Sequence, residues 1–411
     1  MAINAAGIIF SSLNNNTLSR LTDDRTVAAI PFACRYRLID FCLSNMVNAN
    51  ISNINIIANY NYRSLVEHIG SGKDWDLARR EGGINVISPF QTAHSSSVNI
   101  FSTHMEALKN MKEYIDEFKE DYVVLMDSDH VLNIDFNDVI STHEKTGASI
   151  TFVTKVISSD YTSKTPRMML SSVAGKITDI SMNSSYNPKN PELSLNIFVM
   201  KTTQLKKLIE EANAHSLNSF TAMLMSNFRK ENYRTYCYSG YVASVSSFLD
   251  YYKCSIELAK DDTARTSLLW KKEFPVYTKV HNSAPTAHRS TAKVENSMIA
   301  DECVIEGTVI NSVLFRGVHI GKGAVIKNSV LFHGTKVEKN AELNCIVTDK
   351  DVFITEGVNI LNASCLFVTY RLNTLLKSIS SSSKNSYSSG TLFRNSSLII
   401  KLQGSISNSI S

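Results

Sequence analysis

Short apolar runs alternate with amphipathic stretches over the first 260 residues. This alternation is typical of βα units on a largely parallel sheet. It predicts strands at residues 7–10, 53–58, 122–126, 149–156 and 195–200, and helices at residues 62–69, 137–146, 203–212 and 246–260. Asn137 and Asp138 are residue types suited to cap the second helix. Residues 1–260 are therefore expected to form one Rossmann-like α/β domain with a mostly parallel sheet, which binds ligands beyond the strand ends, after Phe10 and Met126.

A second pattern, with a period of six, begins near Thr286. Its apolar positions are Met298, Val304, Ile310, Leu314, Ile320, Ile326, Phe332, Val337 and Leu343. Small residues between them, such as Gly317 and Asn328, suit the corners of a solenoid that forms one flat face every six residues. An amphipathic helix would instead repeat its apolar positions at three and four. We therefore predict a left-handed parallel β-helix of hexapeptide repeats over residues 286–360, preceded by a linker at residues 261–285.

Both patterns are lost after about Leu361, and from Ser378 the chain is rich in serine. A low-complexity segment of this kind cannot bury enough apolar surface to offset its chain entropy. Residues 361–411 are therefore expected to form a disordered tail.

The composition of the chain argues against some classes of binding partner. Forty-two basic and 38 acidic residues give a net charge of +4, which is too balanced for a nucleic-acid-binding surface. No apolar run approaches the roughly 18 residues of a membrane span, and the N-terminus has no targeting pattern. The seven cysteines form no CxxC pair, which favours reduced thiols over disulfides or zinc ligands. We expect a cytoplasmic protein with no nucleic-acid or membrane partner.

Three segments of the first domain carry a specific resemblance. They are LTDDRTVAAIPFACRYRLIDFCLSN at residues 21–45, SLVEHIGSGKDWDLARREGG at residues 64–83 and LMDSDHVLNID at residues 125–135. With the six-residue repeats following in the same order, the chain resembles bacterial ADP-glucose pyrophosphorylase. The resemblance implies a nucleotidyltransferase domain that carries a β-helix. In catalytic members of that family, ATP and glucose 1-phosphate form ADP-glucose and pyrophosphate, a step that feeds glycogen synthesis.

The phosphate-binding part of the resemblance is incomplete. Family members carry a GGxGxRL loop after the first strand, where backbone N–H groups reach the triphosphate. Here only Gly7 and the Arg20-Leu21 end of that loop remain, which predicts a degenerate nucleotide-binding site. Where catalytic relatives read RAKP, this chain has Val27 in place of the lysine. A valine cannot offset developing phosphate charge.

The metal-binding and sugar-binding parts are altered as well. Asp129 matches the first family aspartate and is the candidate ligand for Mg²⁺, which would accompany a bound nucleotide. Ser244 stands where the family has a second aspartate, in a YWRDVG-like motif. Asp127 could compensate, or Asp127 and Asp129 could simply shape the turn after a strand. The family's sugar-phosphate lysine, in an EKP motif, has no equivalent before residues 194–200.

Arg35 and Arg37 are the candidate effector-binding residues. The family associates a basic residue with sugar-phosphate effectors, and Arg35 stands at that position. A guanidinium group binds phosphate through paired hydrogen bonds. Structural contacts with carboxylates remain the alternative for both arginines.

Together these changes favour a chain that has kept the fold and lost catalysis. The resemblance then implies a regulatory subunit that pairs with a catalytic ADP-glucose pyrophosphorylase subunit in a heterotetramer and alters its response to a sugar-phosphate effector. No catalytic residue is assigned. Two alternatives stay open, namely an active glucose-1-phosphate adenylyltransferase with a rearranged site, and a stand-alone module that binds sugar phosphate or nucleotide.

Overall fold

The computed structural model describes residues 4–11, 18–88, 101–157, 166–182 and 191–368, which divide into two compact units. Unit 1 comprises Met1–Ile30, Arg37–Ser246 and Thr266–Lys279, and unit 2 comprises Pro31–Tyr36, Ser247–Arg265 and Val280–Ser411. The α-helices are α1 (Leu38–Asn48), α2 (Arg63–Ile69), α3 (His104–Asn110), α4 (Lys112–Asp116), α5 (Phe136–Thr146), α6 (Thr202–Ala214), α7 (Phe220–Asn227), α8 (Phe248–Lys260) and α9 (Asp262–Leu269). Short 3-10 helices are η2 (Ser19–Thr22), η3 (Val27–Ala29) and η4 (Lys73–Trp75).

The strands of unit 1 form one mixed sheet in the order β5-β4-β1-β6-β11-β8-β12-β10-β9. Its strands are β1 (Ala5–Phe10), β4 (Asn53–Ile57), β5 (Gly83–Ile87), β6 (Tyr122–Asp127), β8 (Ile150–Val156), β9 (Met169–Val173), β10 (Lys176–Ser181), β11 (Glu192–Lys201) and β12 (Tyr233–Cys237). Short pairs are β2 (Pro31–Phe32) with β3 (Tyr36–Arg37), and β7 (His130–Val131) with β13 (Ala243–Ser244).

The sheet is mostly parallel, as predicted, and β11 is an antiparallel exception within it. Strands β5, β4, β1 and β6 are parallel, but β11 runs antiparallel to both β6 and β8. Parallel neighbours need a crossover connection, usually a helix. Between β8 and β11 the described chain instead forms the antiparallel pair β9 and β10, which explains the reversal.

Successive side chains of each strand point to opposite faces of the sheet and contribute to two apolar clusters, one on each face. Ile9 of β1 belongs to the cluster that α1, α2 and α5 complete. Ile8 and Phe10 belong to the cluster that α3, α4, α6 and α7 complete. Because β1 and β6 are parallel and Phe10 lies opposite Asp127, the carboxyl ends of these two strands meet at one edge. The fold therefore places the residues after both strands side by side.

The predicted elements of unit 1 are present with small shifts at their ends. The five predicted strands are β1, β4, β6, β8 and β11, and the four predicted helices are α2, α5, α6 and α8. The cap of α5 was assigned wrongly. Asp135 is the capping residue, because its side chain accepts a hydrogen bond from the backbone N–H of Asn137. None of the helices in the described part of the chain is long and apolar enough to cross a membrane.

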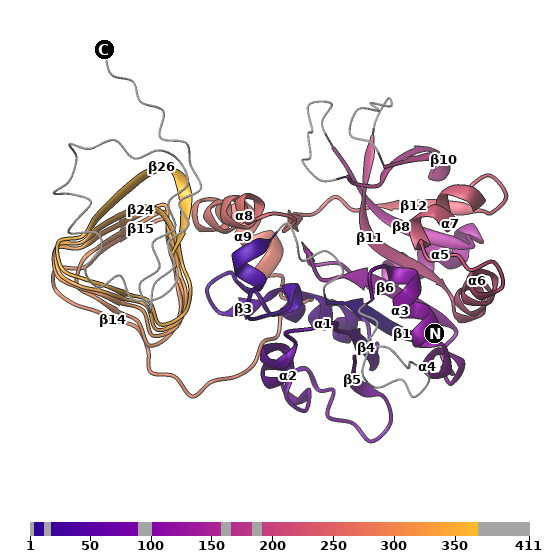
Figure 1. Cartoon of the computed structure of the whole chain (residues 1–411), viewed down its shortest axis with the longest axis horizontal. Coiled ribbons are helices and arrows are strands. Elements are labelled where there is room, and N and C mark those ends of the chain that lie inside the picture. The colour runs from indigo at the N-terminus through magenta and orange to yellow at the C-terminus, as the bar shows by residue number, and fades with distance from the viewer. Residues whose placement is uncertain (1–3, 12–17, 89–100, 158–165, 183–190, 369–411) are drawn as a thin grey trace, which may run out of the picture. The chain divides into compact units, whose positions relative to one another are not determined.

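Unit 2 contains a parallel β-helix with three flat sides (Figure 1). Successive coils pair in register, so that Lys293 pairs with Thr308, Thr308 with Val325 and Val325 with Glu342. Its strands are β14 (Ala287–His288), β15 (Lys293–Glu295), β16 (Met298–Ile299), β17 (Val304–Ile305), β18 (Thr308–Ile310), β19 (Val313–Leu314), β20 (His319–Ile320), β21 (Val325–Lys327), β22 (Val330–Leu331), β23 (Lys336–Val337), β24 (Glu342–Thr348), β25 (Phe353–Ile354) and β26 (Asn359–Val368). Asn328 takes a positive φ of 45°, as expected for a corner residue.

The domain limits differ from the predicted ones. Helix α8, expected to close the α/β domain, belongs to unit 2, where the Tyr252 hydroxyl donates to the Asn328 carbonyl (2.7 Å) and Tyr251 packs edge-on against Phe332. Helix α9 occupies the first part of the predicted linker. Strand β26 pairs with β24 as far as Val368, so the β-helix extends past residue 360. The rest of the predicted tail, residues 369–411, lies outside the described residues.

Candidate functional site

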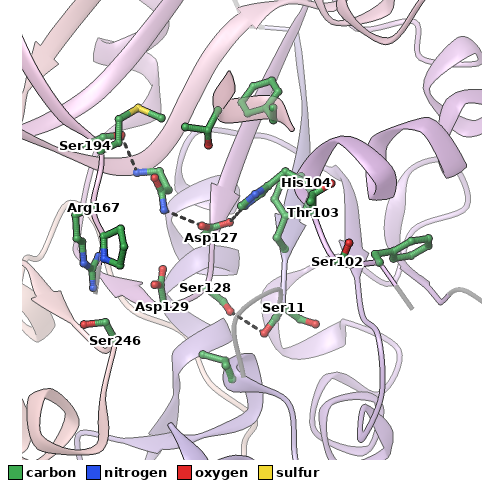
Figure 2. A pocket seen from close by; sticks show the side chains of 18 of the residues that line it. Ser11, Ser102, Thr103, His104, Asp127, Ser128, Asp129, Arg167, Ser194 and Ser246 are labelled. Atoms are coloured by element: carbon green, nitrogen blue, oxygen red, sulfur yellow. Dashed lines mark hydrogen bonds and ion pairs between the residues drawn. The ribbon is translucent and has the colours of Figure 1, made fainter. Parts of the chain in front are cut away.

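A cavity of about 730 Å³ lies at the carboxyl ends of β1 and β6, where the sequence predicted a ligand site. Its acidic, basic and histidine lining residues in the described chain are His104, Asp127, Asp129 and Arg167. Hydroxyl and aromatic side chains make up much of the remaining wall, among them Ser11, Ser102, Thr103, Ser128, Ser194, Ser246, Phe10, Phe101 and Phe220. Figure 2 shows the labelled side chains gathered around the end of β6.

The carboxylate of Asp127 is held from two sides. Its Oδ1 lies 2.7 Å from His104 Nε2, at the first residue of α3, and its Oδ2 accepts from Asn196 Nδ2 of β11 at 3.0 Å. Asn196 reaches this position at a bulge of β11, with a positive φ of 52°. Burial lowers the pKa of His104, but the Asp127 carboxylate outweighs this effect and raises the pKa above its ordinary value.

Asp129 belongs to a second series of hydrogen-bonded side chains. Its Oδ1 lies 2.7 Å from His130 Nδ1, and His130 Nε2 lies 2.9 Å from Arg167 Nη1. A guanidinium has no acceptor, so Nε2 must accept and Nδ1–H must donate to the carboxylate. Burial opposes ionisation of Asp129, but the electrostatic interaction and hydrogen bond with His130, together with the charge of Arg167, outweigh it and hold the pKa of Asp129 well below its usual range. Asp129 is therefore an ionised carboxylate with its counter-charge built into the chain.

Of the two positions at which the resemblance implies lost charge, one lines the cavity and the other adjoins Asp129. Val27 begins η3 and lines the cavity with only 4% of its surface exposed. Ser244 pairs with His130 between β13 and β7, and the next residue, Val245, donates its N–H to the Asp129 carbonyl at 2.7 Å. Ser244 thus lies beside Asp129, although Ser246 rather than Ser244 is among the described residues that line the cavity.

The two residues predicted to bind nucleotide do not line this cavity among the described residues. Gly7 lies inside β1, where an added Cβ would lie 2.4 Å from Met46 Sδ of α1. Its lack of a side chain serves strand-to-helix packing, so its position does not support the predicted role. Arg20 lies in η2. The loop between them, residues 12–17, is outside the described part of the chain.

The two candidate effector arginines have different surroundings. Arg37 Nη1 donates to the carbonyl (2.6 Å) and the hydroxyl (2.9 Å) of Ser64, and burial lowers the pKa of Arg37 to about 10. The Arg37 backbone N–H also donates to Asp40 Oδ2, at the start of α1. Arg35 is exposed and its guanidinium lies 5.9 Å from the centre of the Tyr36 ring. The Arg37 guanidinium is therefore used structurally, although its partner is Ser64 rather than a carboxylate as the alternative stated. Arg35 remains the candidate for phosphate.

Sequence reasoning missed most of the residues that surround the carboxylates. Asp127 had a local signal, because an Asp-x-Asp pair at a strand end places both carboxylates near one edge. His104, Asn196 and Arg167 had none, since each lies in a separate segment far from β6 in the sequence.

These surroundings fit a divalent cation poorly. Mg²⁺ takes oxygen ligands in near-octahedral geometry, usually one or two carboxylates of the protein together with waters and substrate phosphates, so those carboxylates must be free to face it. Both oxygens of Asp127 and one oxygen of Asp129 already have nitrogen partners, and the guanidinium of Arg167 lines the same cavity. The Mg²⁺ site implied for Asp129 is therefore not supported by its neighbours.

Comparisons with known proteins agree with this architecture. A family model described as nucleotidyl transferase matches residues 7–164, and one described as GlmU-like, C-terminal hexapeptide matches residues 280–362. They confirm the predicted nucleotidyltransferase domain followed by a left-handed hexapeptide β-helix.

Individual relatives match over most of their length. Glycogen biosynthesis protein GlgD of Bacillus subtilis (strain 168) is 35% identical over 359 residues, which cover 85% of this chain and 90% of the relative. GlgD of Geobacillus stearothermophilus is 33% identical, covering 78% of this chain and 82% of the relative. Glucose-1-phosphate adenylyltransferase of the same organism is 30% identical, covering 75% and 80%. The chain therefore belongs to the bacterial ADP-glucose pyrophosphorylase (glucose-1-phosphate adenylyltransferase) family, together with these GlgD proteins.

Proposed function

We propose that this chain is a cytoplasmic, catalytically impaired regulatory subunit of ADP-glucose pyrophosphorylase, which acts in glycogen biosynthesis by pairing with a catalytic subunit. Its relatives support the pathway, since they are glycogen biosynthesis proteins and glucose-1-phosphate adenylyltransferases by name. The solenoid of unit 2 is a rigid element of the kind that supplies subunit interfaces.

The proposed loss of catalysis rests on one observation, which is the small amount of positive charge in the cavity lining. Arg167 is the sole lysine or arginine among the described residues that line it, and that guanidinium is already bonded to His130. Attack of a sugar phosphate on ATP brings anions together and needs fixed positive charge at the reacting phosphate. At the position where catalytic relatives are expected to carry a lysine, this chain has the buried side chain of Val27. Loss of one such preorganised group costs roughly 10²-fold or more in rate.

The test compares three preparations: the purified chain, its purified catalytic homologue from the same genome, and the two together. ADP-glucose formation from ATP, glucose 1-phosphate and Mg²⁺ is measured across a titration of sugar-phosphate activators. We expect the chain alone to show less than about 1% of the homologue's rate, in line with at least one lost charge. The mixture should elute as one complex and show a changed rate or activator response.

The same assay separates the alternatives. Turnover by the chain alone, abolished by Asp129→Asn, would establish an active enzyme with a rearranged site and contradict the proposal. Ligand binding by the chain with no change in the homologue's activity would indicate a stand-alone binding module.

Arg35 gives the regulatory part of the proposal a test of its own. We expect Arg35→Ala to weaken the activator response of the complex while leaving the thermal stability of the chain unchanged, because the side chain is exposed. Arg37→Ala is the matched control. It should lower stability instead, because it removes two hydrogen bonds to Ser64. An unchanged activator response in Arg35→Ala would exclude this arginine as the phosphate contact.

A further inference from the structure

Three of the four carboxylate oxygens of Asp127 and Asp129, at the end of β6, have hydrogen-bond partners from this same chain. His104 lies against Asp127 (Figure 2), and His104 and Asn196 hold opposite oxygens of that carboxylate. His130 holds one oxygen of Asp129. These side chains come from α3, β11 and the start of β7, so the arrangement is a feature of the tertiary fold rather than of one loop. Their side chains are largely shielded from water, with 13% of Asp127 and 27% of Asp129 exposed.

Arg167 completes this arrangement with a permanent charge. Its side chain is 9% exposed and it bonds to His130 Nε2, the nitrogen on the far side of the ring from Asp129. An arginine cannot lose its proton in a protein, so this positive charge is present at every relevant pH. A divalent cation placed at Asp129 would face that charge at close range, in surroundings that screen it weakly.

We propose that Arg167, acting through His130, and the donors His104 and Asn196 take the place of the divalent cation in this cavity, so that the site has no affinity for Mg²⁺. The aspartates are then structural anchors for the end of β6. This inference rests on the proposed function. It adds a physical reason why the aspartate that the chain shares with the family does not support catalysis.

The experiment measures metal binding directly, with Mn²⁺ alone as the probe for Mg²⁺. Free Mn²⁺ is followed by electron paramagnetic resonance while the full chain is titrated in. We expect the unmodified chain to show no site at Asp129 tighter than about 1 mM. This readout involves no turnover, so failure of the proposed function would appear as ADP-glucose formation and failure of the inference would appear as bound Mn²⁺.

Removal of the built-in partners should create the missing site. The double variant His104→Ala/Arg167→Gln frees one oxygen of Asp127 and removes the opposing charge. It is expected to bind Mn²⁺ at least about tenfold more tightly than the unmodified chain. Adding Asp129→Asn should abolish that gain. Arg79→Ala is the matched control, because it removes an exposed arginine from its own aspartate partner, Asp76, and should change nothing.

Two results would overturn the proposal. One is a Mn²⁺ site tighter than about 1 mM in the unmodified chain that Asp129→Asn removes. The other is a folded double variant, judged by circular dichroism, with no gain in Mn²⁺ affinity. Should the double variant fail to fold, Arg167→Gln alone carries the test. It keeps an amide donor for His130 without the charge, and absence of any gain there also refutes the idea.

Discussion

The packing of Gly7 against α1 makes a quantitative prediction. In Gly7→Ala the new methyl group would lie 2.4 Å from Met46 Sδ, 2.9 Å from Met46 Cε and 3.7 Å from Ile51 Cγ2. Met46 is fully buried, so it cannot swing into water and must repack inside the core. Overpacking of this kind costs about 1–3 kcal/mol, and the lower backbone entropy of alanine returns roughly 0.5–1 kcal/mol of it. A net loss of about 1 kcal/mol is expected, within a range of roughly 0–2.5 kcal/mol.

A double-mutant cycle tests whether the Met46 side chain causes the loss of stability in Gly7→Ala. Met46→Ala alone should cost about 2–5 kcal/mol, and in the Gly7→Ala background it should cost less, because the sulfur that clashes is gone. Urea unfolding is followed through tryptophan fluorescence, since the two tryptophans, Trp75 and Trp270, both belong to unit 1. Strictly additive effects would refute the packing explanation. A Gly7→Ala variant of unchanged stability that loses nucleotide binding would also refute it, and would support the predicted role of Gly7 in binding the nucleotide phosphates.

Two further predictions concern titratable groups. Burial, with the charge of Lys201, lowers the pKa of His143 to about 4, whereas the unfolded side chain titrates near about 6.5. The unfolded state binds the extra proton between these values, so stability is full above about pH 6.5 and falls by up to about 3 kcal/mol as the pH drops towards 4. Urea unfolding of His143→Gln should show a flatter acid slope, and an unchanged slope would contradict this assignment. Burial also raises the pKa of Cys34 to about 12 and that of Cys42 further, so Ellman's reagent at pH 8 should label exposed Cys237 while those two thiols react only after denaturation. Rapid labelling of Cys34 in the native chain would show that its site opens.

Much of the architecture could be predicted because it follows from local periodicity. The continuous apolar runs of β1 and β6 are typical of strands buried on both faces of a sheet, and the six-residue spacing of unit 2 arises from its flat faces. Both signals are contained in consecutive residues. Strand direction is not, and the antiparallel direction of β11 within the mostly parallel sheet was therefore not predicted.

Domain limits were harder to predict for the same reason. The sequence of α8 is that of an ordinary amphipathic helix, and nothing in it indicates which of two cores it joins. Its contacts with Asn328 and Phe332 decide this, and those residues lie far along the chain.

The sequence alone determined which chemical groups this protein has at the positions of the family's motifs: valine at residue 27, serine at residue 244 and aspartate at residue 129. The tertiary structure alone decided what those groups face. Asp127 meets His104 and Asn196 across separations of 23 and 69 residues, and Arg167 meets His130 across 37. Local patterns report the side of a strand or helix on which a side chain lies, whereas such pairings depend on strand order and on one bulge, which arise only when the whole sheet assembles.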